Sequence, residues 1–293
     1  MEKIGFVGLG MMGAPMALKL VKNSKNTILC YDIDKNRVSQ LEKEGAISAH
    51  SIYEVAHDCN IIFLSMPSNE ILKDNVMKIL ETGHAGMIIV DMGSTAPKVI
   101  YGLYEMAKAQ DIYLMDCPVS GGPAAAEKGS LAIMCGGEEQ AYMAVLPYLR
   151  CMGKSITYTG PSGSGSATKL VNNIIVGGIL LSVAEAFAFG AKAGLDATTL
   201  FNAIKDGGAK NAFMENNMFR RMVERDYVPG ARAAVHQKDL KNAVDLAKSL
   251  DIDLPLTKLI LSYMAKLEQQ GRVNEDHCAI ATIYEDEMNV HIG

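Results

Sequence analysis

Short apolar runs alternate with amphipathic segments through the first half of the chain. The runs predict strands at residues 3–7, 27–31, 60–65, 87–91 and 112–116. Helical spacing of apolar residues fills the segments between them, starting with residues 12–22. Strands that alternate with helices in this way indicate βαβ units, and therefore a parallel sheet with right-handed crossovers. Further strand-like runs at residues 131–135 and 155–158, with a helical run between them, predict that the sheet extends beyond residue 116.

The pattern changes near residue 160. Residues 160–167 read GPSGSGSA, and this glycine- and serine-rich composition predicts a loop at a domain boundary. Beyond it helical spacing dominates, because apolar or small residues recur at steps of three and four along residues 170–188. Further helical patterns cover residues 197–205, 211–223, 238–250, 256–270 and 277–289. The sequence therefore predicts an α/β domain of the Rossmann type at residues 1–161 and an all-α domain at residues 162–293.

The composition is that of a folded protein and excludes some functions. Of the 293 residues, 49% are apolar and 21% are charged, with a formal net charge of -5. Proteins that bind nucleic acids usually carry a basic surface, so we expect no such partner. The apolar stretch at residues 170–184 is shorter than the roughly 20 residues of a membrane span. Residues 4–18 are uncharged but contain glycines and a proline, so we expect neither a membrane span nor a signal peptide.

The cysteines and histidines show no ligand pattern. The six cysteines are scattered without a C-x-x-C pair, and the six histidines form no H-x-x-x-H pair. Scattered cysteines are typical of reduced thiols, so we expect a cytoplasmic protein. The sequence gives no support for a metal site.

A glycine-rich turn follows the first predicted strand and leads into a predicted helix. It reads Gly8-Leu9-Gly10-Met11-Met12-Gly13. Glycines at this spacing allow a tight turn, close approach to a pyrophosphate and tight packing of the helix on the strand. The N–H groups at the start of the helix then bind the phosphates. We therefore predict a dinucleotide site that includes all six residues.

The end of the second predicted strand bears on the choice of dinucleotide. A carboxylate such as Asp32 accepts the ribose hydroxyls and repels a 2′-phosphate, which favours NAD over NADP. Lys35 and Arg37 follow closely in the sequence, and they keep NADP as the alternative.

Two later segments also carry candidate chemistry. Ser120-Gly121-Gly122 follows the strand predicted at residues 112–116, and paired glycines there can present backbone N–H groups to an anion. Lys169 and Asn173 are four residues apart, so on a helix they share one face about 6 Å apart along the axis. Removal from water or a nearby cation lowers the pKa of such a lysine, so that it exchanges protons near neutrality.

Four ordered motifs together resemble the β-hydroxyacid dehydrogenase family. They are GLGMMGAPMA (residues 8–17), CPVSGG (117–122), G-x-G-x-x-x-K-L-V-N-N (163–173) and HQKDL (236–240). The segments LPLT (254–257) and DHCAIATIYE (276–285) are most similar to the tartronate semialdehyde reductase branch. The resemblance implies that the all-α domain is of the 6-phosphogluconate dehydrogenase C-terminal type.

The resemblance also implies roles on the substrate side. Lys169 matches the catalytic lysine, and Asn173 matches a residue that holds the substrate. Ser120, Gly121 and Gly122 match the loop that binds the substrate carboxylate. Cys117 stands where many members have alanine, and we interpret it as a small packing residue.

On the cofactor side the resemblance implies four further contacts. Thr95 matches a contact to the nicotinamide end, and Lys238 matches a lysine next to the cofactor. Met66 and Pro67 match a turn at a strand end that borders the cofactor. Gly93 replaces a more usual serine near the nicotinamide.

The implied reaction moves a hydride between nicotinamide and a small 3-oxo or 3-hydroxy carboxylate, with Lys169 exchanging the proton. No arginine occurs between Arg37 and Arg150, so that part of the chain offers no bidentate clamp for a bulky dianion. This favours a three- or four-carbon acid such as tartronate semialdehyde or methylmalonate semialdehyde, and the resemblance to the reductase branch favours tartronate semialdehyde. Arginines in the second half keep 2-(hydroxymethyl)glutarate and sulfolactaldehyde as alternatives, together with 3-hydroxyisobutyrate.

An alternative of another class is a non-catalytic dinucleotide-binding sensor, since fold does not determine function. The presence of Lys169 beside Asn173 favours an enzyme. Similar proteins use the long apolar helix that starts near Lys169 to interlock subunits, so we expect a homodimer or a homotetramer.

Overall fold

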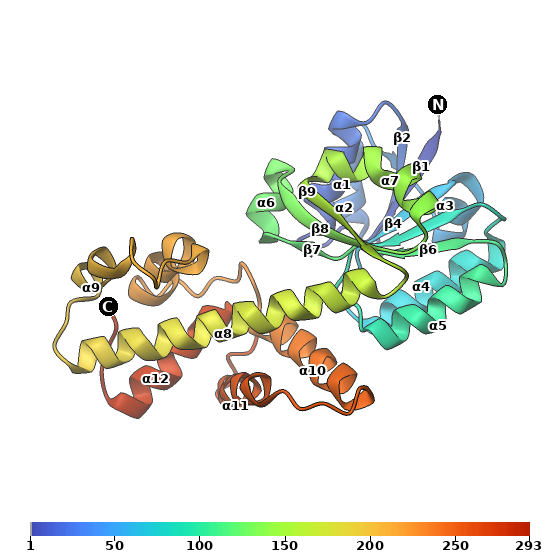
Figure 1. Cartoon of the computed structure of the whole chain (residues 1–293). Helices are drawn as coiled ribbons and strands as arrows, with labels where there is room; N and C mark the ends of the chain where they lie inside the picture. The colour runs from blue at the N-terminus through green and yellow to red at the C-terminus, as the bar shows by residue number, and fades with distance from the viewer. Residues whose placement is uncertain (1) are drawn as a thin grey trace. The chain divides into compact units, whose positions relative to one another are not determined.

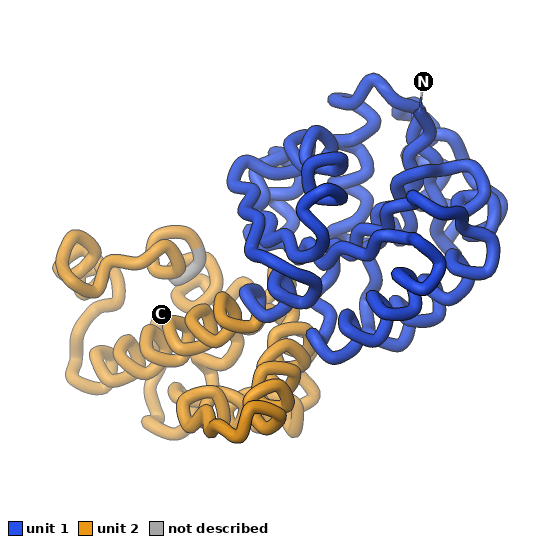
Figure 2. The backbone as a smooth tube through the Cα atoms, turned by 45° about the vertical axis from the view of Figure 1, so that its right-hand side comes forward, with its two compact units in different colours: residues 1–169 blue, residues 170–293 orange. Residues whose placement is uncertain are grey.

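The structure is a computed structural model that describes residues 2–293. Contacts divide the chain into two compact units at Lys169 and Leu170 (Figure 2). The sequence pattern places the division earlier, at residues 161 and 162, because the glycine- and serine-rich composition of residues 160–167 predicts a loop. This prediction is wrong for the second half of the segment, since Ser164 already begins a helix that runs to Lys192 (α8) and crosses the division.

The first unit is built on a nine-stranded sheet in the order β3-β2-β1-β4-β5-β6-β8-β7, with β9 paired to β8. Strands β1 to β6 are parallel, and β8 runs antiparallel to β6 and β7. The strands are β1 (Lys3–Val7), β2 (Thr27–Tyr31), β3 (Ile47–Ser48), β4 (Ile61–Leu64), β5 (Ile88–Asp91), β6 (Tyr113–Asp116), β7 (Val119–Ser120), β8 (Leu131–Gly136) and β9 (Gly153–Gly160).

Helices cover both faces of this sheet (Figure 1). They are α1 (Gly13–Asn23), α2 (Lys35–Glu42), α3 (Ile52–Asp58), α4 (Asn69–Thr82), α5 (Pro97–Lys108), α6 (Gly122–Lys128) and α7 (Glu139–Met152). In β4, Ile61 and Phe63 face the core under α1 and α7, whereas Ile62 and Leu64 face the core under α3, α4 and α5. The predicted parallel α/β sheet is thereby confirmed, with strands buried on both faces.

The second unit consists of helices around the middle of α8. They are α9 (Ala197–Ile204), the π-helix η1 (Met214–Val223), α10 (Ala233–Ser249), α11 (Pro255–Gln269), the short 3-10 helix η2 (His277–Ile280) and α12 (Ala281–Met288). The stripe predicted along α8 is buried at Leu181, Ala184 and Ala188. The predicted all-helical second domain is confirmed.

Helix α8 is longer than the apolar stretch suggested. Among the described residues, α8 is the one helix whose length and composition would allow it to cross a membrane. Within its most apolar 18 residues, 44% are buried inside the protein. Its buried stripe packs in the same core as Leu240 and Ile260, so we interpret α8 as the core helix of this unit.

Asp116 fixes the start of α8 to the sheet. Its carboxylate is fully buried at the end of β6 and accepts the N–H groups of Gly163, at 2.8 Å, and Ser166, at 2.6 Å. These donors belong to the turn that the glycine- and serine-rich sequence would otherwise leave irregular. Burial raises the pKa of the Asp116 carboxyl, and the two N–H donors oppose part of that rise.

We expect Asp116→Ala to lower the free energy of unfolding by about 2–4 kcal/mol, because each buried N–H left unsatisfied costs about 1–3 kcal/mol. The matched control is Asp196→Ala. Asp196 caps α9 from an exposed position, where it accepts the N–H of Thr199 at 2.8 Å, and losing such a cap costs about 1 kcal/mol. Urea denaturation followed by circular dichroism measures both, and equal losses in the two variants would contradict the anchoring role of Asp116.

Candidate active site

The predicted dinucleotide turn lies between β1 and α1, and two of its glycines are required by the fold itself. Gly8 has a φ of +91°, and a Cβ there would lie 2.4 Å from the carbonyl oxygen of Ser65. A Cβ on Gly13 would lie 1.9 Å from the carbonyl oxygen of Gly8. Any side chain at these two positions would therefore collide with the backbone.

Gly10 is different. A Cβ at Gly10 would meet only the Nη1 atom of Arg37, at 3.8 Å, which is ordinary contact. Packing within the described chain therefore does not require this glycine, whereas the close approach of a pyrophosphate would. Met12, which precedes α1, supplies no side-chain cap for the N–H groups of the first turn. The residues of this turn thus fit a bound dinucleotide.

Asp32 lies next to this turn, at the end of β2, and is only 7% exposed. Its Oδ2 atom accepts the N–H of Leu9 at 2.6 Å, and its Oδ1 atom accepts the N–H of Asp34 at 2.8 Å. The Nη1 atom of Arg37 lies 3.8 Å from Asp32 Oδ2. A carboxylate has about four acceptor positions, so these bonds leave room for a ribose hydroxyl.

The other predicted cofactor contacts of the first unit follow strands β4 and β5. The parallel register sets Val7 beside Leu64 and Leu64 beside Asp91, so the ends of β1, β4 and β5 lie along one edge. Met66 is half-buried and Pro67 is exposed in the turn before α4. That edge is where open α/β sheets bind their ligands.

Thr95 is 5% exposed, and its hydroxyl donates to Asp91 Oδ2 at 2.6 Å. The same carboxylate accepts the N–H of Gly93 through Oδ1 at 2.9 Å. Asp91 therefore shapes the loop that carries Thr95, and the sequence reasoning missed it. A strand that ends in an aspartate two residues before a glycine was the available signal.

Ser120, Gly121 and Gly122 lie where β7 ends and α6 begins. Gly121 has a φ of +126° and Gly122 a φ of +69°. Side chains are strained at such angles, so both glycines are required by the backbone path. The register sets Asp91 beside Asp116, so this loop follows the next strand along the same edge of the sheet. Its role in binding a carboxylate stays a prediction.

Lys169 and Asn173 both lie in α8, so the predicted helix for this pair is present. Lys169 is half-buried, and Asn173 is 8% exposed. The Asn173 side chain is held on both sides, because its Nδ2 donates to Asp239 Oδ2 at 2.7 Å and its Oδ1 accepts from Asn172 at 2.9 Å.

Asp239 also links Asn173 to the predicted cofactor lysine. Lys238 Nζ lies 3.2 Å from Asp239 Oδ1, and Asp239 is 2% exposed. Asp239 belongs to the HQKDL motif, but the motif alone assigned it no role. A carboxylate on the buried face of a helix was the signal that it needs partners.

A cluster of potential metal ligands occurs that the sequence did not predict. Ligand atoms of Asp276, His277 and Cys278 lie within 4.8 Å of one another. Asp276 Oδ2 already accepts the N–H groups of Gly230 and Ala231, at 2.8 and 2.9 Å. Burial raises the pKa of the Cys278 thiol, which opposes the thiolate that a metal needs. We interpret the cluster as structural.

Cys117 behaves as the sequence suggested. Its side chain is fully buried in the core under α1 and α7, and burial raises the pKa of its thiol well above the ordinary value. It is therefore a packing residue rather than a nucleophile.

Comparisons with known proteins cover both units. Two protein-family models match the chain: the NAD binding domain of 6-phosphogluconate dehydrogenase over residues 3–160, and the NAD-binding domain of NADP-dependent 3-hydroxyisobutyrate dehydrogenase over residues 163–284. The chain is 33% identical over 295 residues to 2-(hydroxymethyl)glutarate dehydrogenase of Eubacterium barkeri, covering 99% of this chain and 97% of that one. It is 31% identical over 290 residues to 2-hydroxy-3-oxopropionate reductase of Escherichia coli, covering 97% of each.

A solved structure of 3-hydroxyisobutyrate dehydrogenase from Mycobacterium tuberculosis, with L-serine, is similar with a TM-score of 0.88 at 25% identity. The match covers 97% of this chain and 99% of that chain.

The two kinds of glycine make a direct test of the dinucleotide site. We expect Gly10→Ala to leave the melting temperature nearly unchanged and to weaken NADH binding about tenfold, a loss of about 1.4 kcal/mol. Gly13→Ala, the control, should lower the melting temperature because its Cβ meets the Gly8 carbonyl. NADH fluorescence titration and thermal unfolding measure the two effects. If Gly10→Ala binds NADH like the unmodified protein, the turn does not hold a pyrophosphate.

Proposed function

We propose that this chain, which belongs to the β-hydroxyacid dehydrogenase family, reduces a small 3-oxo carboxylate with a nicotinamide dinucleotide, with tartronate semialdehyde as its best substrate and glycerate as the product. Both family models describe NAD-binding domains, and the named relatives are dehydrogenases and reductases, so the chain is an NAD(P)-dependent oxidoreductase. The substrate, the roles of individual residues and the preferred dinucleotide are our inferences.

Lys169 donates the proton in this proposal. When bound, the dinucleotide supplies the hydride. Reduction of an aldehyde places negative charge on its oxygen, and the ammonium group of Lys169 neutralises that charge by giving up a proton. Asn173 lies one helical turn away, and the Asp239 carboxylate fixes its amide. The loop Ser120–Gly122 binds the substrate carboxylate through its backbone N–H groups.

The arginines of the second unit carry the argument for a small substrate. A second carboxylate or a sulfonate on the substrate would require a cationic clamp. Arg220 donates to Asp226 Oδ2 at 2.6 Å, and Arg225 donates to both Glu285 oxygens at 2.8 and 2.7 Å. Arg221 donates to the backbone carbonyls of Asp226 and Val228. These three arginines, which are candidates for binding a larger diacid, are thus engaged by groups of the fold itself.

NAD is the preferred dinucleotide in this proposal. Asp32 is buried next to the glycine turn, where its charge repels a 2′-phosphate. Arg37 favours the opposite choice, but it also lies 3.3 Å from Asp34, which takes up part of its charge.

All six cysteines are free thiols, the state that a reducing compartment maintains, and we place the enzyme in the cytoplasm.

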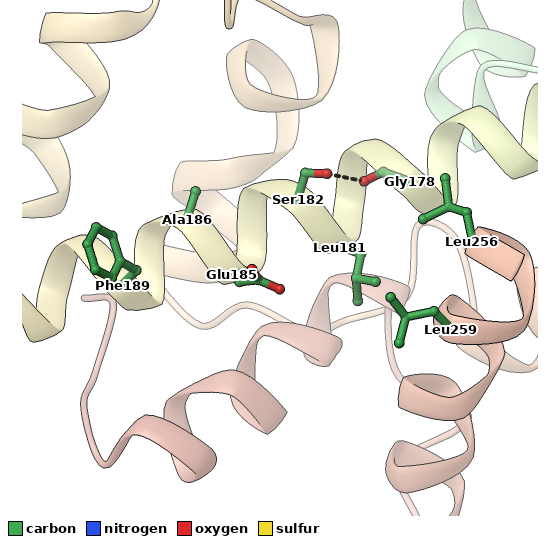
Figure 3. A pocket seen from close by; sticks show the side chains of 8 residues that line it. All are labelled: Gly178, Leu181, Ser182, Glu185, Ala186, Phe189, Leu256 and Leu259. Atoms are coloured by element: carbon green, nitrogen blue, oxygen red, sulfur yellow. Dashed lines mark hydrogen bonds between the residues drawn. The ribbon is translucent and has the colours of Figure 1, made fainter.

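An apolar groove along α8 supports self-association as a homodimer or homotetramer. Figure 3 shows Leu256 and Leu259 of α11 beside Leu181 of α8, and Phe189 further along α8. Phe189 is 67% exposed, and Leu256 and Leu259 are 51% and 50% exposed. Apolar side chains gathered in this way mark an interaction surface, and a second copy of the chain is the occupant we propose.

Steady-state assays with four substrates and both dinucleotides test the reaction. We expect kcat/KM for tartronate semialdehyde to exceed that for the aldehyde form of 2-(hydroxymethyl)glutarate by about tenfold or more, because the missing clamp costs at least about 1.4 kcal/mol for a dianion. Methylmalonate semialdehyde and sulfolactaldehyde, which carry one negative charge each, complete the set of four substrates. NADH should outperform NADPH. A larger diacid as the best substrate would contradict the argument from the arginines.

Lys169→Ala is the matched variant for these assays. It should lower kcat by about 10²–10⁴-fold while NADH binding stays within about twofold, because only the proton donor is lost. Lys192→Ala removes an exposed lysine at the other end of α8 and should leave kcat unchanged. If no substrate accelerates NADH consumption while NADH still binds, a non-catalytic dinucleotide sensor becomes the better assignment.

Leu259→Glu should shift the protein toward the monomer in sedimentation velocity at micromolar concentration, because it buries a charge in the proposed contact. Leu250→Glu is the control, since Leu250 is 61% exposed and does not line the groove. A monomeric unmodified protein would contradict the proposal.

A further inference from the structure

Two buried histidines lie together in the core of the second unit, and the proposed reaction uses neither. His236 of α10 is 6% exposed and His277 of η2 is 9% exposed. Their Nδ1 atoms are 2.9 Å apart, although the residues are 41 positions apart in the sequence. The remaining histidines, His50, His57, His84 and His291, are exposed.

The contacts of the pair determine where the protons are. His236 Nε2 lies 2.9 Å from the backbone carbonyl oxygen of Asn173. A carbonyl oxygen only accepts, so Nε2 of His236 carries the proton, and in a neutral ring its Nδ1 is then an acceptor. His277 must therefore donate from its own Nδ1. The result is a one-way chain of hydrogen bonds from His277 to His236 to Asn173.

The fold leaves space beside α8 for this chain of hydrogen bonds. A Cβ on Gly177 would lie 3.4 Å from Cε1 of His236 and 3.2 Å from Cδ1 of Ile260, closer than side chains usually pack. Gly177 is also four residues after Asn173, so it lies one helical turn further on the same face of α8. The absence of a side chain at Gly177 lets the imidazole ring reach the carbonyl of Asn173.

Helix α10 holds Asn173 at two points. His236 donates to its backbone carbonyl, and Asp239 accepts from its side-chain amide at 2.7 Å. Positions 236 and 239 are three residues apart, so they lie on one face of α10. The backbone contact fixes the position of Asn173, and the side-chain contact fixes the rotation of its amide.

The surroundings of His277 favour its neutral form. Burial and the neighbouring His236 lower the pKa of His277 to about 4, Asp276 opposes that change, and Arg221 adds to it. Because this pKa lies below the ordinary value of 6.5, the unfolded chain binds the proton more readily, and stability is lost as the pH falls from 6.5 towards 4. A proton on Nδ1 of His236 would set two donors face to face and break the chain.

We propose that His236 and His277 are positioning residues that hold Asn173 where it orients the substrate. The assignment of substrate orientation to Asn173 rests on the proposed function, whereas the direction of the hydrogen-bond chain rests on the geometry alone. In this chain of hydrogen bonds, His277 sets the tautomer of His236. That tautomer lets Nε2 of His236 donate to the carbonyl of Asn173. Changing His277 therefore acts on a substrate that His277 does not touch.

The first test reads the protons without any substrate. The full-length protein with ¹⁵N-labelled histidines is studied by NMR from about pH 8 to about pH 5.5, a range that spans the ordinary histidine pKa. We expect His236 protonated at Nε2 and His277 at Nδ1 throughout this range. A His236 ring protonated at Nδ1, or a His277 ring without a proton on Nδ1, would overturn the proposal.

The second test separates positioning from packing. His277→Phe keeps a ring but removes the donor, whereas His277→Asn retains an N–H near the position of Nδ1. We expect His277→Phe to raise KM for the semialdehyde or lower kcat by about tenfold, with NADH affinity unchanged. It should also add an acidic limb to the pH profile, because Nδ1 of His236 is then able to take up a proton. His277→Asn should restore most of the loss.

The two tests fail separately. Folded His277→Phe with unaltered kinetics and pH profile would overturn the positioning role. If the unmodified protein reduces no semialdehyde, the proposed function fails, yet the NMR result still decides whether the hydrogen-bond chain exists.

Discussion

A single buried carboxylate determines where the longest helix begins. Asp116 ends β6 and accepts two N–H groups at the start of α8, so the last parallel strand and the helix share one anchor. The contact is close, because a Cβ on Gly165 would lie 2.3 Å from the carbonyl oxygen of Asp116. The loop Ser120–Gly122 follows the same residue along the chain. Asp116 therefore anchors the helix that carries Lys169, the candidate proton donor, and it also precedes the candidate carboxylate-binding loop in the sequence.

The sequence predicted what depends on local pattern. Strands β1 and β2 have the predicted bounds, because strands buried on both faces appear as continuous apolar runs. Strands β3 and β7 have two residues each and are too short to show a periodicity. The start of α8 could not be predicted, since Ser164–Ala167 has a loop composition and its Ser166 is held by Asp116, an aspartate 50 residues earlier. The conformation of such a segment depends on partners that are distant in the sequence.

The same limit applies to the candidate site. Local patterns predicted the glycine turn and Asp32, the carboxylate expected to bind the ribose. The resemblance of four motifs supplied the roles of Lys169 and Asn173. What the sequence missed are the groups that hold those residues. Asp239 bonds to Asn173 across 66 positions, and His236 reaches His277 across 41. These contacts depend on how α8, α10 and η2 pack, which no short pattern records.

The central claim is that the chain transfers hydride from a reduced nicotinamide to the aldehyde carbon of a small carboxylate. The most direct measurement is the reduction of tartronate semialdehyde with NADH carrying deuterium at C4, in separate samples labelled on each face, followed by mass spectrometry of the product. We predict one deuterium at C3 of glycerate from one of the two labelled forms and none from the other. Glycerate without deuterium from both forms, or no glycerate at all, would contradict the claim.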